Sequence, residues 1–102
     1  MRKTQALIQV AVALMADPQG KHWGYNLTKR SGVRSGVLYP ILRRLLDEHW
    51  ISDGWEDPAT AGGRPPRRYY QLTELGHQEL RALLAIAGNE PRFQDIIPGW
   101  AR

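Results

Sequence analysis

The chain is predicted to fold as a mostly helical α+β domain, a winged helix-turn-helix with three helices, a two-stranded wing and a C-terminal dimerisation helix. Two observations support this prediction. A helical pattern that ends in paired arginines is followed by a short tryptophan-rich strand, a basic Gly/Pro-rich loop and a returning strand. The returning strand leads directly into a further helix. A helix, a basic hairpin and a second helix in this order are typical of a winged helix.

Length and composition limit the chain to one compact domain. With 102 residues there is no room for a second core. The absence of cysteine excludes disulfides and thiolate metal sites and favours a reducing cytoplasm. No apolar run reaches the ~20 residues that span a bilayer. Arg2 and Lys3 precede an apolar run, as in a signal peptide, but the run continues through Asp17-Pro18 into domain-like sequence. We therefore expect a cytoplasmic protein.

The positive charge is concentrated in two places. The net charge is +4, and residues 1–49 hold eight Lys and Arg against three acids. Residues 50–72 hold three of each, including the cluster Arg64, Arg67 and Arg68, and residues 73–102 hold three against four. A basic surface attracts polyanions through counterion release. The total charge alone is equally compatible with ordinary solubilising charge.

The first two helices are predicted over residues 4–16 and about 23–30. Asp17-Pro18 ends the first, and residues 19–22 form a turn. The first helix has almost no polar face, so it requires burial on more than one side. Ser31-Gly32 ends the second, because glycine tolerates the left-handed conformation at a helix end.

A third helix is predicted from Ser35, as its N-cap, to about His49. Its apolar residues keep the spacing of one helical face, with the arginines mainly on the other. Pro40 leaves the start uncertain, because proline favours the first helical position. If Ser35 is the cap, Pro40 removes one main-chain hydrogen bond early in the helix.

Turn residues and a helix-capping residue predict the wing and the last helix. Residues 50–56 and 67–72 are predicted strands around the Gly/Pro-rich loop, with Ile51 and Trp55 on one face of the first strand and Tyr70 and Leu72 of the second facing inward. Thr73 caps the last helix, which Gly88 closes. We assign residues 1–88 to the winged domain, with its terminal helices in a dimer interface, and residues 89–102 to a partly ordered C-terminal tail.

The third helix and the wing together are predicted to bind double-stranded DNA. Small residues at the start of the helix let backbone amides approach phosphate, and its first turns fit the major groove. Each element alone is also compatible with solvated surface arginines. Three further basic residues lie near the turn between the helices. The predicted DNA-binding residues are Lys29, Arg30, Arg34, Ser35, Gly36, Tyr39, Arg43, Arg44, Arg64, Arg67 and Arg68.

The combination resembles the PadR family of bacterial winged-helix transcriptional regulators over roughly residues 5–85. The matching segments are His22-Trp23-Gly24-Tyr25, which carries an inserted tryptophan, Ser35-Gly36-Val37-Leu38-Tyr39-Pro40-Ile41-Leu42-Arg43-Arg44-Leu45, Gly63-Arg64-Pro65 with Arg67-Arg68, and Tyr70-Gln71-Leu72-Thr73 with Gly76. The resemblance implies a homodimeric repressor on an inverted-repeat operator. It also implies that Ser35, Gly36, Tyr39 and Arg43 face DNA from the helix and the wing arginines from the loop. The last helix is shorter than the family's long dimerisation arm.

The terminal helices also predict a dimer on physical grounds. From Leu80 to Ala87 only Arg81 is polar, so one small domain cannot cover this helix. The alternative is that the first and last helices bury each other inside one chain. The predicted interface residues are Leu7, Val10, Ala11, Leu14, Leu80, Leu83, Leu84 and Ala87.

Four tryptophans are many for this length, and most are expected to pack in the core or on strands. Some members of the resembled family bind flat aromatic effectors between tryptophans of the dimer interface, which suggests Trp100 as an effector pocket. The three histidines are dispersed without metal-ligand spacing, and no nucleophile has a basic partner nearby. The sequence therefore predicts no enzyme, no metal and no cofactor.

A sequence-specific DNA-binding repressor is the leading functional hypothesis. One alternative is a winged-helix protein-interaction module that uses the hairpin and tail. Another is an architectural or excision-type DNA binder of a mobile element. Arginine pairs on both helix and wing favour DNA over protein, and a dimer favours an operator with two half-sites.

Overall fold

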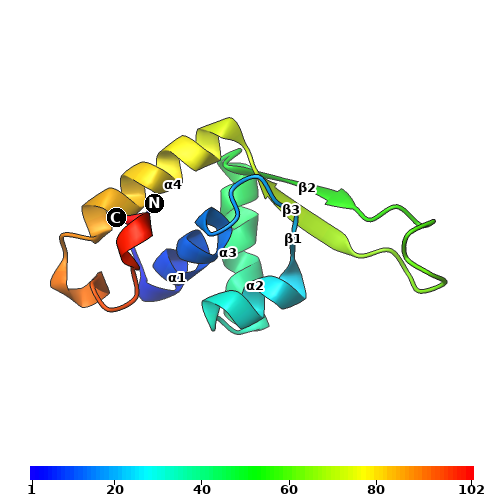
Figure 1. Ribbon diagram of the computed structural model, residues 1–102, viewed down its shortest axis with the longest axis horizontal. Coiled ribbons are helices and arrows are strands. Elements are labelled where there is room, and N and C mark those ends of the chain that lie inside the picture. Colours follow the sequence, from blue (N-terminus) through cyan, green and yellow to red (C-terminus); the bar gives the residue numbers. More distant parts are fainter.

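A computed structural model describes all 102 residues as a helical body with a projecting two-stranded wing (Figure 1). The helices are α1 (Gln5–Met15), α2 (Gly24–Ser31), α3 (Ser35–Asp47) and α4 (Glu74–Ala87), with short 3-10 helices η1 (Pro91–Phe93) and η2 (Gly99–Ala101) near the C-terminus. The strands β1 (His22–Trp23), β2 (Ile51–Trp55) and β3 (Arg68–Leu72) form one antiparallel sheet in the order β1-β3-β2. The predicted winged helix-turn-helix is confirmed. No helix is both long and apolar enough to cross a membrane.

The wing gives the molecule its elongated shape of 47 × 25 × 23 Å. In Figure 1, α4 lies along the top of the body and α2 at the bottom, while α3 runs between these two levels. The hairpin of β2 and β3 leaves the body on the right and ends in the Gly/Pro-rich loop. The start of α3 therefore lies on the side of α2, and its end on the side of α4.

The first and last helices bury each other inside the single chain, which is the alternative to the predicted dimer interface. Both contribute to one hydrophobic core with α3 and the tail. Seven of the eight predicted interface residues are already covered, so they are not available to a second subunit in this conformation; only Leu83 is half-buried. The covered residues are Leu7, Val10, Ala11, Leu14, Leu80, Leu84 and Ala87.

Helix α3 begins at Ser35 as expected, but its N-cap is Arg34 and no side chain caps it. Pro40 lies inside the helix, which tolerates the missing amide on an exposed turn. The helix ends at Asp47, two residues before the predicted end. His49 there adopts a left-handed conformation (φ 61°), which histidine reaches more readily than most residues, and turns the chain into β2.

The sheet contains one strand that the sequence pattern did not predict. Residues 22 and 23, expected to form a turn and the start of a helix, pair with Tyr70 and Tyr69 as β1. A two-residue strand carries no period that a sequence pattern can detect. In β2, Ile51 is buried, whereas Trp55, predicted on the same face, is 69% exposed because it lies beyond the helical body on the wing.

Thr73 joins α4 to the sheet through two hydrogen bonds. Its Oγ1 accepts from the Gly76 amide at 2.9 Å, which confirms the predicted cap, and donates to the His49 carbonyl at 2.6 Å. The Thr73 amide also donates to the Trp50 carbonyl at 3.0 Å. One residue therefore fixes the start of α4 against the end of the α3–β2 turn.

Replacing Thr73 with alanine is expected to lower the free energy of unfolding by about 1–2 kcal/mol, because the amide and the carbonyl both lose their partner. Urea denaturation measures the change. Thr60→Ala, which removes one exposed hydrogen bond near the wing tip, is the control and should change stability by less than about 0.5 kcal/mol. Equal effects of the two substitutions would contradict the role of Thr73.

The segment 89–102, predicted to be a partly ordered tail, packs on the core. Phe93 and Ile97 are each 2% exposed and belong to the hydrophobic core. Arg102 donates from its guanidinium to the carbonyls of Gln94 and Ile97. The sequence did not predict this packing, because only two buried apolar residues, Phe93 and Ile97, are too few to form a detectable period.

Candidate nucleic-acid interface

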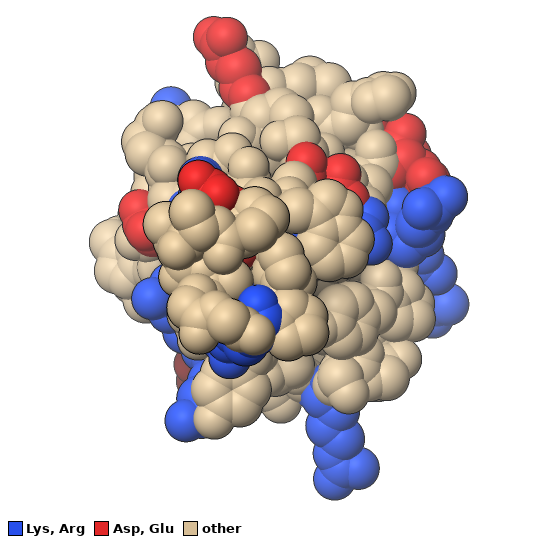
Figure 2. Space-filling model, turned by 90° about the vertical axis from the view of Figure 1, so that its right-hand side faces the viewer, with Lys and Arg blue, Asp and Glu red and all other residues tan.

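All eleven predicted DNA-binding residues are exposed in the folded chain. In Figure 2, which faces the wing tip, most basic side chains lie in the lower half and at the right, whereas several acidic side chains lie in the upper half, on the side of α4. The lower half is the side of α2 and of the start of α3. On this face the basic side chains are thus more numerous on the side of α2 and the start of α3, where a polyanion would be attracted.

The outer surface of α3 carries its predicted contact residues. Leu38, Ile41, Leu42 and Leu45 point into the core. The remaining positions of the first turns are exposed, and Tyr39 is 47% exposed. The exposed predicted residues of this helix are Ser35, Gly36, Tyr39, Arg43 and Arg44.

The cations on and near α3 differ in how they are paired. Arg43 lies 3.5 Å from Asp47 one turn on, a solvated pair that contributes little. Arg30, Arg34 and Arg44 form no ion pair, and the Lys29 ammonium lies 5.0 Å from the ring centroid of Tyr25. These side chains keep most of their charge available for an anionic partner.

The wing arginines are held by acids that the sequence pattern did not connect to them. Arg64 forms a two-pronged pair with Glu56, at 2.6 Å (Nη1–Oε1) and 2.9 Å (Nη2–Oε2). Arg68 pairs across the strands with Asp53, at 2.7 Å from its Nε. Of the three wing arginines only Arg67 forms no ion pair. Two ion pairs therefore connect the strands and loop of the hairpin, and the Arg67 guanidinium is its unpaired cation.

Glu56 is expected to titrate below an unpaired glutamate, because the Arg64 hydrogen bond holds the pKa of that carboxyl below its usual value. A depressed pKa in the folded state means that the pair is intact at neutral pH and is lost as the pH falls through that pKa. A carboxyl-detected NMR titration measures the midpoint. Arg64→Gln should move the midpoint back toward the ordinary value, while Arg81→Gln on α4 should not. A midpoint that does not move in Arg64→Gln would contradict the Arg64–Glu56 pair.

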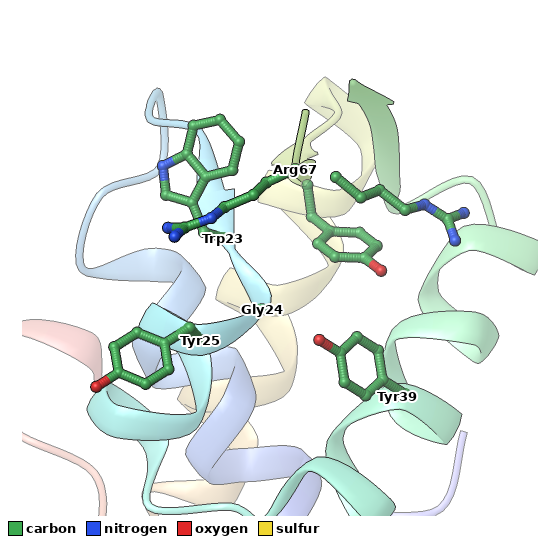
Figure 3. Close-up of a pocket in the computed structure, with 7 residues that line it drawn as sticks. Trp23, Gly24, Tyr25, Tyr39 and Arg67 are labelled. Carbon is green, nitrogen blue, oxygen red and sulfur yellow. The ribbon is translucent and has the colours of Figure 1, made fainter. Parts of the chain in front are cut away.

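A cleft of about 600 Å³ lies between the start of α2, the outer face of α3 and the base of the wing (Figure 3). Aromatic side chains and arginines dominate its lining: Trp23, Gly24, Tyr25, Tyr39, Arg67, Arg68 and Tyr70. The predictions named only Tyr39, Arg67 and Arg68 here. The His-Trp-Gly-Tyr segment was noted for its resemblance, but nothing in the sequence indicated that it meets the wing.

Trp100, the predicted effector residue, lies elsewhere. It sits on η2, is 59% exposed, and does not line the cleft.

Comparison with known proteins agrees with this geometry. The sequence model of the transcriptional regulator PadR-like family matches residues 14–82. No curated protein matches the chain. Among solved structures, a PadR-family transcriptional regulator from Eggerthella lenta is 27% identical, with a TM-score of 0.62 over 78% of this chain and 71% of that one.

Two further structures share the fold. A PadR-family regulator from Clostridium difficile is 22% identical, with a TM-score of 0.61 over 89% of this chain and 90% of its own. BpsR from Bordetella bronchiseptica, whose DNA binding is regulated by 6-hydroxynicotinic acid, is 20% identical, with a TM-score of 0.68 over 95% of this chain and 67% of its own. The family model covers more than half of the residues. The chain therefore belongs to the PadR-like family of winged-helix, DNA-binding transcriptional regulators, and is not an enzyme.

Proposed function

We propose that the chain represses transcription as a homodimer on an inverted-repeat operator, with α3 in the major groove and the wing on the flanking backbone. The observation that carries this proposal is the exposure of all eleven candidate residues, together with the excess of basic side chains in the lower half of Figure 2. The unpaired cations supply phosphate contacts, which position the protein on DNA. The first turns of α3 present Ser35, Gly36 and Tyr39 for contacts to base edges and nearby phosphates.

A dimer would use an exposed apolar surface, and not the residues buried between α1 and α4. Ile86 is 58% exposed on α4, and Trp100 is 59% exposed on η2, which packs against α4. Leu75 and Ala82 lie on the same stripe of α4 as Ile86, because Ala82 follows Leu75 by seven residues and Ile86 follows Ala82 by four, and both are exposed. To contact two half-sites one turn of DNA apart, pairing of this surface about a two-fold axis has to place the two α3 helices about 34 Å apart.

Ile86→Asp is expected to convert the dimer into a monomer. A carboxylate at the centre of the apolar contact would have to give up its hydration without a compensating partner. Sedimentation equilibrium measures the mass. Arg81→Asp, which changes an exposed residue about 140° around the same helix, is the control and should remain dimeric. A parent protein that is monomeric at all concentrations, or an Ile86→Asp protein that remains dimeric, would contradict this interface.

The operator can be located by protection mapping on the DNA upstream of the chain's own coding sequence, with affinity followed against salt. Two protected half-sites with centres about one helical turn apart, and a steep loss of affinity with salt, are the expected result. Uniform protection without half-sites would favour an architectural binder. Absence of binding to any duplex at low salt would refute the proposed function.

A further inference from the structure

The wing joins the helical body through an aromatic contact at its base. Trp23 is the last residue of β1 and pairs with Tyr69 of β3, one position nearer the loop than the His22–Tyr70 pair. The two rings meet edge to face, with their centroids 5.6 Å apart and their planes at 75°. The Lys21 ammonium lies 4.6 Å from the centroid of the same Tyr69 ring. Two side chains of the segment that precedes α2 therefore hold Tyr69.

The Tyr69 ring also reaches the other strand of the wing. Its hydroxyl group occupies the space beside Gly54 of β2, where a Cβ atom would lie 2.5 Å from the hydroxyl oxygen. Gly54 is the partner of Tyr69 in the ladder, so any larger residue at position 54 displaces the ring. The contact between Trp23 and Tyr69 therefore connects β1, β3 and β2 on one face of the sheet.

The inner end of this contact is fixed to the helices. His22 is 2% exposed, and its Nε2 donates to the Asp17 carbonyl at 2.8 Å, shortly after the end of α1. Trp23 itself is the N-cap residue of α2. Beyond Tyr69 the wing lies outside the helical body, and Trp55 at the end of β2 is exposed. Because a two-stranded hairpin alone is only marginally stable in water, the angle of the wing depends on the contacts at its base.

The unpaired cation of the wing lies next to this contact. The Glu56 amide donates to the Arg67 carbonyl at 2.8 Å, so the ladder continues from β3 to Arg67. Arg67 precedes Tyr69 by two residues, and alternate residues of a strand share a face. Arg67 and Trp23 line the same cleft, and Figure 3 shows the Arg67 side chain extending toward Trp23. The position of this guanidinium therefore follows the angle of the wing.

We infer that Trp23 is a positioning residue for DNA binding, which holds the wing and Arg67 at one angle to α3. Trp23 acts through Tyr69 and supplies no charge to the DNA. A wing that swings freely loses conformational entropy when it is ordered on the DNA backbone, and a wing that is already oriented avoids this cost. The role in DNA binding rests on the proposed function, whereas the fixed angle of the wing does not.

The angle of the wing is tested without DNA by pulsed electron paramagnetic resonance. The chain has no cysteine, so Ala59→Cys in the wing loop and Arg81→Cys on α4 place nitroxide labels at two exposed positions. Labelled chains are diluted with unlabelled chains, so that any dimer carries one pair of labels. The parent should give one narrow distribution of distances, and Trp23→Ala should give a clearly wider one.

Three further variants show whether the Trp23–Tyr69 contact is the cause. Trp23→Phe keeps a ring against Tyr69 and should restore most of the narrow distribution. Trp55→Ala removes the same type of side chain from the opposite face of the wing and should leave the distribution narrow. Gly54→Ala displaces the Tyr69 ring and should widen the distribution as Trp23→Ala does. A distribution in Trp23→Ala as narrow as in the parent would overturn the inference. Should circular dichroism show that Trp23→Ala is unfolded, Gly54→Ala decides in the same way.

The effect on DNA is tested by two double-mutant cycles on the affinity for the upstream duplex. Trp23→Ala should weaken binding by up to about 10-fold and lower the slope of log affinity against log salt by up to about 0.9 per chain, because the Arg67 contact is lost. Adding Trp23→Ala to Arg67→Ala should therefore weaken binding by less than about 2-fold. Adding Trp23→Ala to Arg43→Ala on α3 should instead give the full further loss. A general loss of stability would affect both cycles alike.

The two experiments separate the positioning role from the proposed function. Full additivity in both cycles would overturn the role of Trp23 in DNA binding, even if the distance distribution widens. A parent that binds no duplex would refute the proposed function. If the wing of that parent is held at one distance and Trp23→Ala widens the distribution, the fixed angle of the wing stands.

Discussion

Replacement of both Arg43 and Arg67 by alanine is expected to lower the affinity for operator DNA by at least about 100-fold at ~0.1 M salt. Arg43 lies on the outer face of α3 and Arg67 at the base of the wing, so the double variant removes one cation from each of the two elements that are proposed to hold the backbone. A hydrogen bond to a charged group contributes about 1.5–3 kcal/mol, and two per chain are lost. The fold should be unaffected, because both side chains are exposed.

The salt dependence distinguishes phosphate contacts from base contacts. Each phosphate contact that is lost should reduce the slope of log affinity against log salt by about 0.9, so the slope should fall by about two per chain. Specificity for the operator over random duplex should change little, since phosphate contacts carry no sequence information. Fluorescence anisotropy at four or five salt concentrations gives both quantities.

The matched control is the double variant Arg81→Ala with Arg92→Ala. It removes the same number of positive charges, but from α4 and η1. Both arginines are exposed and neither lies on α3 or the wing. This control should retain most of its affinity, with only the small loss that a lower net charge causes at long range. If the two double variants behave alike, the affinity depends on total charge alone, and the assignment of the interface to α3 and the wing is wrong.

The sequence predicted the elements whose patterns are local. The period of α3, the Thr73 cap and the basic Gly/Pro-rich loop were each sufficient to place an element to within about two residues, and their order predicted the fold. The candidate DNA residues on α3 and the wing were all placed on exposed positions. The exposed face of a helix can be predicted from the spacing of its apolar residues, and this spacing is visible in the sequence.

Features that depend on the meeting of distant segments were not predicted. The burial of α1 against α4 was considered only as the alternative to a dimer interface, because the apolar surface of each helix alone does not show which partner covers it. The pairing of Arg68 with Asp53 and the cleft beside Trp23 both depend on strand register, which is fixed by the sheet as a whole. The ion pairs leave the Arg67 guanidinium as the one wing cation without a carboxylate partner.

Gly76→Ala is expected to destabilise the domain by more than about 4 kcal/mol, the range of exceptional single substitutions. Gly76 is buried in the first turn of α4, three residues after the Thr73 cap. A Cβ atom there would lie 1.7 Å from the carbonyl oxygen of Trp50 and 2.5 Å from its carbonyl carbon. These are backbone atoms of the residue just before β2, so no side-chain rotation relieves the overlap. Urea or thermal denaturation followed by circular dichroism measures the loss.

The Trp50 carbonyl also explains why Gly76→Ala is expected to reduce the free energy of unfolding so strongly. The Trp50 carbonyl accepts the Thr73 amide, so moving it away from residue 76 breaks the hydrogen bond that ties α4 to the sheet. Gly36→Ala is the control, because a Cβ atom on that helical glycine meets nothing within 4 Å. It should leave stability unchanged or raise it by up to about 1 kcal/mol, since alanine favours helix over glycine. A Gly76→Ala protein as stable as Gly36→Ala would mean that α4 can shift away from β2 at little cost. The wing is continuous with β2, so such freedom would also remove the rigid link between α4 and the wing.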